Sequence, residues 1–184
     1  MLAVLSVLSV TSAIALTHSK RSRQTAQSPY SDQLTSPVRG LSAQEVDNLL
    51  NGRGAGYATT AELNSYPGPL HILELQDQLE VSNEQIQQIE SVFQKMNAQA
   101  KALGQSIVER EQALSAAFEN NKINRSELQT QTQQLAELYG KLRATHLEAH
   151  LAVTPLLSPE QIATYDNLRG YTGSESSYEH RHNH

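Results

Sequence analysis

The chain has 184 residues, of which 38% are hydrophobic and 5% aromatic, and its formal net charge is −5. This length suits one domain with tails, and the acidic balance without a basic stripe excludes a general nucleic-acid binder. The chain contains no cysteine, which excludes disulfides, thiolate metal sites and cysteine nucleophiles. Abundant Gln, Ala, Leu and Glu in the middle of the chain favour long, partly exposed helices.

Residues 1–15 form an uncharged apolar stretch that ends in Ala13-Ile14-Ala15, a small-x-small sequence that signal peptidase can cut. The stretch is short for a membrane span, so we interpret it as a secretory signal peptide and expect a periplasmic protein. No Lys or Arg precedes this stretch, whereas Lys20, Arg21 and Arg23 follow it, opposite to the usual order. Two explanations remain open: a start codon placed too far downstream, which we favour, or an uncleaved N-terminal anchor.

The next segment, residues 16–40, is rich in Ser, Thr, Gln, Arg and Pro without apolar periodicity, which predicts a disordered linker. Residues 172–184 have the same character and are predicted to be a disordered tail that contains histidines. Between them, residues 41–171 are predicted to form one helical domain. Its first short helix begins at the capping box Ser42-x-x-Glu45 and ends near Asn51-Gly52.

Two long helices are predicted in the middle of this domain, after a short helix from His71 to Leu79. The first long helix begins at the capping box Ser82-x-x-Gln85, and the second begins at Asn124-x-x-Glu127 and runs to about Val153, where Pro155 ends it. Apolar residues in the first helix alternate three and four apart, as in a coiled-coil seam that Arg110 interrupts once: Ile86, Ile89, Phe93, Met96, Ala100, Leu103, Ile107, Leu114 and Ala117.

A last short helix begins at Ser158-x-x-Gln161, with Pro159 at its first position, and ends at Arg169-Gly170. Because the turn between the long helices is short, they must form an antiparallel hairpin. The predicted fold class is therefore all-α, a long antiparallel helical hairpin with short helices covering its open end. Each long helix buries only one seam, so we expect a homodimer to supply the missing apolar burial.

Two segments of the chain resemble a known sequence motif. Leu157-Ser158-Pro159-Glu160-Gln161 resembles the LTxxQ pentapeptide of a family of periplasmic stress proteins, with Ser in place of Thr, and Val81-Ser82-Asn83-Glu84-Gln85 resembles it more loosely. Two such boxes flanking a helical hairpin are similar to the Spy/CpxP family and its metal-responsive relatives ZraP and CnrX, over residues 66–171. The resemblance implies holding of unfolded clients, damping of envelope stress signalling, or binding of zinc, nickel or cobalt.

Four residues are the predicted metal shell. His146 and His150 are four apart on a predicted helix, so both imidazoles project from one face and can bind one Zn, Ni or Co ion. This spacing resembles the HxxxH pair of the metal-sensing relatives, although those carry a second pair in their first helix, where only His71 stands here. His71 and Glu74 can fold back to the same end of the hairpin. In the alternative interpretation these are ordinary polar positions, with His71 packed under the Pro-rich turn.

Other patterns carry weaker chemistry. His180, His182 and His184 in the tail can recruit metal weakly, but a solvated tail is the interpretation we favour. The segment Gly52–Gly56 is similar to a phosphate-binding loop, but it follows a helix and lacks the Lys-Ser/Thr ending, so this function has no support. No Ser or Asp stands in a nucleophile elbow or another recognisable catalytic setting, so we do not expect an enzyme.

The leading functional hypothesis is a Spy/CpxP-like periplasmic stress protein that acts by binding and holds unfolded or membrane-associated clients. The first alternative is a heavy-metal sensor or resistance protein in which Zn, Ni or Co at the predicted shell signals to a membrane partner, an envelope sensor. The second alternative is a structural helical protein that binds one dedicated partner. None of the three involves nucleic acid.

Overall fold

The computed structural model describes residues 28–172. The predicted signal peptide, residues 16–27 of the predicted linker and the predicted tail after Thr172 lie outside the described residues. Every regular element of the described part is helical, which confirms the all-α fold class. In chain order the elements are η1 (Ser31–Thr35), α1 (Ala43–Leu50), α2 (Thr59–Glu62), α3 (Pro69–Glu74), α4 (Asn83–Glu119), α5 (Arg125–Val153), η2 (Thr154–Leu156) and α6 (Pro159–Leu168).

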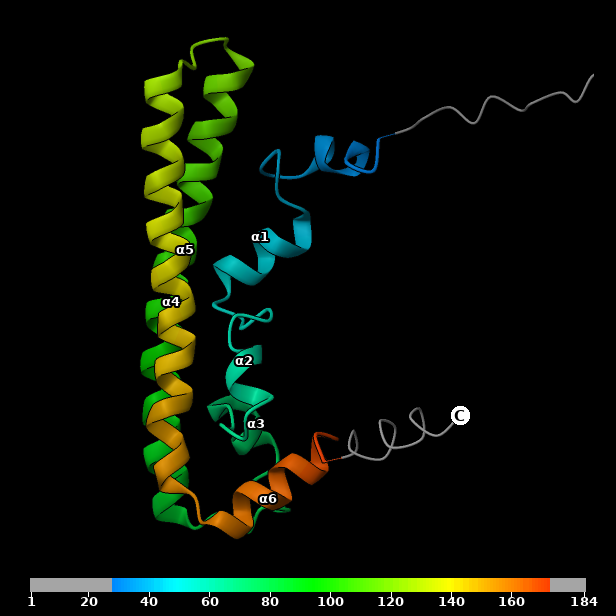
Figure 1. Ribbon diagram of the computed structural model, residues 1–184, viewed down its shortest axis with the longest axis vertical. Coiled ribbons are helices and arrows are strands. Elements are labelled where there is room, and N and C mark those ends of the chain that lie inside the picture. Colours follow the sequence, from blue (N-terminus) through cyan, green and yellow to red (C-terminus); the bar gives the residue numbers. More distant parts are fainter. Residues whose placement is uncertain (1–27, 173–184) are drawn as a thin grey trace, which may run out of the picture.

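The two long helices α4 and α5 form the predicted antiparallel hairpin, which runs along the longest axis of the molecule (Figure 1). Asn121 closes the turn between them with a φ of 53°, a left-handed conformation that Asn tolerates better than most residues. The predicted seam of α4 is also confirmed, because Ile89, Met96, Ala100 and Ile107 are buried in the structure.

Apolar side chains gather in two separate clusters along the hairpin. The mid-hairpin cluster joins the N-terminal segment to the middle of both long helices and consists of Val38, Leu41, Val46, Leu49, Ala100, Ile107, Val108, Leu135 and Leu142. The open-end cluster joins α3 and α6 to the ends of the hairpin and consists of Ile72, Leu79, Ile89, Val153, Leu157 and Tyr165. The two clusters share no residue, so they occupy different parts of the hairpin.

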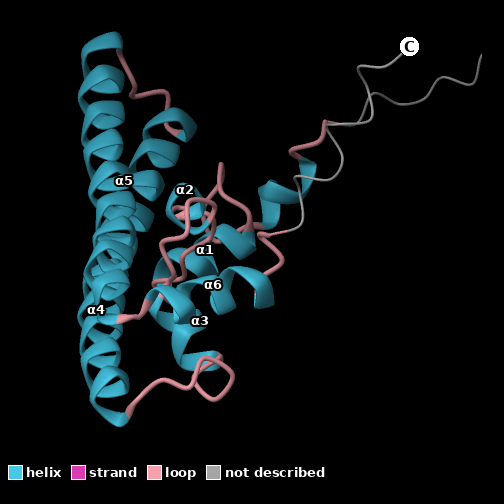
Figure 2. Ribbon diagram, turned by 60° about the horizontal axis from the view of Figure 1, so that its bottom comes forward, coloured by secondary structure: helices cyan, strands magenta, loops and turns pink. Residues whose placement is uncertain are grey.

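The short helices are distributed differently from the prediction. Figures 1 and 2 show α3 and α6 at the open end of the hairpin, as predicted, but α1 lies against the middle of α4. The reason is Gly104, since a methyl group there would lie 1.9 Å from the Leu49 carbonyl oxygen. The missing side chain lets the last turn of α1 approach the α4 backbone, and this approach buries Leu49 and Val46.

Two boundaries also differ from the prediction. Val38, inside the segment predicted as linker, is only 2% exposed, so buried contacts begin before residue 41. The helix predicted from His71 to Leu79 instead begins at Pro69 and ends at Glu74. Residues 75–80 turn back toward α4, and Glu80 adopts a φ of 50°.

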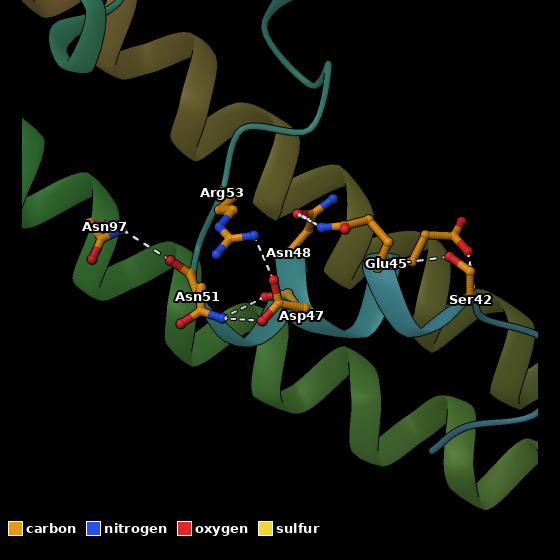
Figure 3. Close-up of polar contacts among 8 residues, drawn as sticks. Ser42, Glu45, Asp47, Asn48, Asn51, Arg53 and Asn97 are labelled. Carbon is orange, nitrogen blue, oxygen red and sulfur yellow. Dashed lines mark hydrogen bonds and ion pairs between the residues drawn. The ribbon is translucent and has the colours of Figure 1, made fainter. Parts of the chain in front are cut away.

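Both ends of α1 are held by side chains (Figure 3). Ser42 Oγ accepts a hydrogen bond from the Glu45 amide at 3.2 Å, and the Ser42 amide donates to Glu45 Oε2 at 2.7 Å, so the predicted capping box is confirmed. At the other end, Asn97 Nδ2 of α4 donates to the Asn51 carbonyl oxygen at 3.3 Å. This bond ties the end of α1 to the hairpin.

The two remaining predicted Ser boxes are also confirmed, and their glutamines bind each other. Each of Gln85 and Gln161 accepts from the amide of its own cap serine at 2.9 Å. Gln85 Nε2 then donates to the Leu156 carbonyl oxygen at 2.6 Å and to Gln161 Oε1 at 3.0 Å, while Gln161 Nε2 donates to the Leu79 carbonyl oxygen at 3.2 Å. The two boxes thus close the open end of the hairpin together.

The box predicted at Asn124 is wrong in one half. Asn124 Oδ1 accepts from the Glu127 amide at 3.0 Å, but the Glu127 carboxylate accepts from Gln131 Nε2, one turn further along α5, at 3.3 Å. A glutamate drawn along its own helix cannot also return to the cap amide.

We predict that Gly104→Ala destabilises the fold by about 1–3 kcal/mol, because the methyl group collides with the Leu49 backbone. Gly140→Ala in α5 is the matched control, since a methyl group there meets nothing within 4 Å and a helical alanine gains about 0.5–1 kcal/mol over glycine. Urea unfolding of both variants measures the difference. Equal stabilisation of both would show that α1 does not rest on Gly104.

Candidate functional site

A pocket of about 590 Å³ lies on the hairpin between the two clusters. We call it the histidine pocket, because His71, His146 and His150, three of the four predicted metal ligands, line it. Its walls come from the loop after α1, from α2, from the turn before α3, and from both long helices. The fold therefore brings together residues that are far apart in the chain.

His150 has a defined hydrogen-bond arrangement. It is 6% exposed, and its Nδ1 lies 2.8 Å from the Tyr66 carbonyl oxygen. A carbonyl oxygen only accepts, so Nδ1 carries the hydrogen and, in the neutral ring, Nε2 carries the lone pair. Gly68 makes room for this ring, because a methyl group at Gly68 would lie 3.2 Å from His150 Nε2 and 2.8 Å from Glu62 Oε1.

His146 lies one turn before His150 and is only 3% exposed. Its ring stacks on the Tyr57 ring with 5.9 Å between centroids and 8° between planes, and its buried Nε2 has no hydrogen-bond partner. Burial, and to a lesser degree the neighbouring His150, lowers the pKa of His146 below its ordinary value. The ring is therefore neutral at neutral pH and offers an unsatisfied nitrogen, which is uncommon for a buried polar group.

The structure separates the fourth predicted ligand from the pocket. Glu74 does not line it, and the Glu74 side chain is 57% exposed. His71 turns toward Glu74, with 2.9 Å between His71 Nδ1 and Glu74 Oε2. Within residues 28–172, no three His, Asp or Glu side chains are placed to hold one ion together. Metal binding at these residues stays a prediction.

Glu62 was not among the predicted site residues, yet its carboxylate lies in the same pocket. The Tyr165 hydroxyl lies 3.0 Å from Glu62 Oε1 and 2.8 Å from Oε2, and the Tyr171 hydroxyl donates to Oε2 at 3.0 Å. The Gly68 amide in turn donates to the Tyr165 hydroxyl oxygen at 3.3 Å. Burial is the main cause that raises the pKa of Tyr165, so this hydroxyl keeps its proton and remains a donor.

No local signal could have found these partners. The contacts of Glu62 with the two tyrosines span 103 and 109 residues, and the contact of His150 with Tyr66 spans 84. Sequence periodicity reports neighbours within a few helical turns only. The feature that was visible, the Tyr66-Pro67-Gly68-Pro69 turn, supplies the carbonyl oxygen and the glycine that position His150 and Glu62.

Comparison with protein families gives one match. The model of the LTXXQ motif family protein matches residues 69–169, which include α3, the whole hairpin and α6. No curated protein and no solved structure gives a significant match to the chain.

Proposed function

Because this chain belongs to the LTXXQ motif family, the family of Spy/CpxP-like proteins, we propose that it holds unfolded or membrane-associated client proteins by binding alone. Catalysis has no part in this proposal. The family is typically periplasmic, and we propose export through the apolar residues 1–15. Mass spectrometry of the envelope fraction tests export, with a mature N-terminus expected near Leu16. Among the described helices, none is long and apolar enough to cross a bilayer.

The observation that supports client binding is a group of exposed apolar side chains on one segment. Leu50, Leu63, Tyr66 and Leu70 are 40–64% exposed, and all belong to the stretch from the end of α1 to the beginning of α3. Leu63 and Leu70 also line the histidine pocket, which adds apolar surface from Phe93 and Met96. Exposed apolar side chains on a folded protein favour binding of apolar segments of other chains.

This surface suits weak and reversible holding. The apolar side chains stand on short helices and turns, and α1 and α3 pack on the long hairpin. A client that gains burial on only a few leucines at a time binds by about 1–2 kcal/mol per side chain and exchanges rapidly. Such contacts hold an unfolded chain without trapping it.

Metal binding is the second candidate function, and the two buried imidazoles favour it. His146 Nε2 has no partner, and the lone pair of His150 Nε2 is left open by the bond from Nδ1 to Tyr66. Neutral imidazole nitrogens on one helix face are ligands for Zn, Ni or Co. A complete shell needs further ligands, and the side chains as they stand in residues 28–172 do not supply one. A sensor would require His71 to leave Glu74.

We also propose a homodimer, although not for the reason that the sequence suggested. The N-terminal segment already covers one side of the hairpin and contributes the burial expected from a second copy. A groove of about 380 Å³ remains on the hairpin, lined by Gln99, Ala102, Leu103, Ser106, Lys141, Ala144, Thr145 and Glu148. If two copies of α5 cross antiparallel at Ala144-Thr145, Lys141 of each copy faces Glu148 of the other.

For client holding, we predict that Leu63→Ser with Leu70→Ser raises the concentration needed to suppress aggregation of a denatured model client roughly tenfold, because two apolar contacts are lost. Leu151→Ser with Leu128→Ser is the matched control, since those leucines are similarly exposed, at 60% and 37% against 64% and 43%, and lie outside the pocket. Light scattering measures suppression. A wild-type protein without suppression would favour the dedicated-partner alternative.

For metal, we predict that His146→Ala or His150→Ala weakens Zn, Ni or Co binding by orders of magnitude in calorimetry, whereas deletion of the tail from Glu179 onward changes little. Affinity should fall as the pH drops below about 6.5, because imidazole must be neutral to bind metal. The lowered pKa of His146 shifts the loss at that residue to lower pH. If metal binding requires the tail but neither His146 nor His150, the metal site does not lie in the pocket.

For the dimer, we predict that Lys141→Glu raises the dissociation constant roughly tenfold, because the substitution turns two attractive pairs into repulsive ones. Lys141→Glu combined with Glu148→Lys should restore the wild-type value, since the exchanged charges again face each other. Sedimentation equilibrium measures both. A monomeric wild-type protein, or a double variant as weak as the single one, would contradict this interface.

A further inference from the structure

We propose that the histidine pocket binds a primary ammonium group carried on an aliphatic stem. The group can belong to a free alkyl amine or to a lysine side chain. If the ligand is a free amine, the inference is independent of the proposed function. If the ligand is a lysine side chain of a client, the inference rests on the proposed function.

The inner part of the pocket presents hydrogen-bond acceptors. His150 Nε2 offers a lone pair, because Nδ1 is committed to the Tyr66 carbonyl oxygen. Glu62 Oε1 lies on the same side of the Gly68 backbone, since both atoms would be within 3.2 Å of a methyl group placed there. No ion pair engages the Glu62 carboxylate among the described residues. The carboxylate is thus available to a cation from outside the chain.

His146 is the second observation that points to a ligand. The residue is only 3% exposed, it lines the pocket, and its Nε2 has no hydrogen-bond partner. An ammonium group carries three N–H donors and no acceptor. Such a group bonds to acceptors, and the Glu62 carboxylate and the imidazole nitrogens that line this pocket are acceptors.

The walls of the pocket determine what carries the charge. Phe93 and Met96 of α4 line it, and Leu63 and Leu70 stand at it with 64% and 43% exposure. A volume of about 590 Å³ is far larger than an ammonium group alone requires, and it accommodates a stem of several methylene groups. Apolar walls around a charged end are the arrangement in which lysine-like side chains place their stems along apolar surface.

Arg169 gives the proposal its sharpest test, because it is a cation that lines the same pocket. Its guanidinium lies over the Tyr171 ring, 5.9 Å from the centroid, and forms no ion pair with Glu62. The Glu62 carboxylate instead accepts from the hydroxyls of Tyr165 and Tyr171. An ammonium ligand is attracted by Glu62 and repelled by Arg169, whereas an anionic ligand would reverse both signs.

The experiment uses the full chain and two small probes, N-acetyl-lysine methylamide and N-acetyl-norleucine methylamide, followed by nuclear magnetic resonance of the imidazole nitrogens. The two probes share the aliphatic stem and differ in the ammonium group. The lysine probe should shift the signals of His146 and His150 in a saturable way, and the norleucine probe should bind at least roughly tenfold more weakly, as expected for the loss of a charged hydrogen bond. This comparison needs no variant.

Variants then assign the charge. Glu62→Gln should weaken binding of the lysine probe roughly tenfold, and Arg169→Gln should strengthen it. Glu74→Gln is the control, because this carboxylate lies outside the pocket and should leave the affinity unchanged. Equal binding of both probes, or weaker binding in Arg169→Gln, would overturn the proposal.

A third set of measurements distinguishes a free amine from a lysine side chain as the source of the ammonium group. Butylamine and a lysine-containing peptide are compared, and Glu62→Gln is tested in the aggregation assay. A defect of Glu62→Gln that is confined to lysine-rich clients assigns the pocket to client side chains, whereas binding of butylamine with normal suppression assigns it to a free amine. Binding of butylamine and of the lysine-containing peptide by a protein that suppresses no aggregation would contradict the proposed function but support the ammonium site.

Discussion

Two glutamine side chains exchange hydrogen bonds at the open end of the hairpin, and the connection of α6 to the hairpin depends on this exchange. Each glutamine uses its oxygen to cap its own helix and its amide nitrogen to reach the other side: Gln85 bonds the Leu156 carbonyl oxygen, and Gln161 bonds the Leu79 carbonyl oxygen. A glutamate could supply the cap but would lack the N–H donors. The bonds join the beginning of α6 to the beginning of α4, and from α6 the Tyr165 hydroxyl donates to Glu62, a residue that lines the pocket.

The elements of this fold could be predicted because their signals are local. Ser42, Ser82 and Ser158 cap helices through residues three positions ahead, and the three-four spacing from Ile89 to Ile107 reports a single helix face. The position of α1 could not be predicted in this way. Gly104 reads as a weak helix former in the sequence, whereas its function is to admit the Leu49 backbone, a contact between residues far apart in the chain.

About half of the candidate site could be predicted, again because only part of its signal is local in the sequence. The spacing of His146 and His150 placed both rings on one face, and the structure brings them, with His71, to one pocket. Their burial and the exclusion of Glu74 depend on how the segment before the hairpin folds over α5. Glu62, Tyr57 and Tyr171 come from that segment and from the end of α6, so only the assembled chain shows that they surround the histidines. The spacing of apolar residues along one helix does not predict which polar side chains from other segments lie next to the histidines.

The close approach of Leu49 to Gly104 has a further consequence for the pocket. The chain from Asn51 to Tyr66 is anchored at both ends, by α1 and Asn97 on one side and by the turn at Gly68, which bonds Tyr165, on the other. This span has a fixed number of residues, and it lines the pocket together with His146 and His150. Lengthening or shortening it would widen or narrow the mouth of the pocket while both apolar clusters stay intact. Selectivity in such a protein can therefore diverge through loop length alone, at little cost to stability.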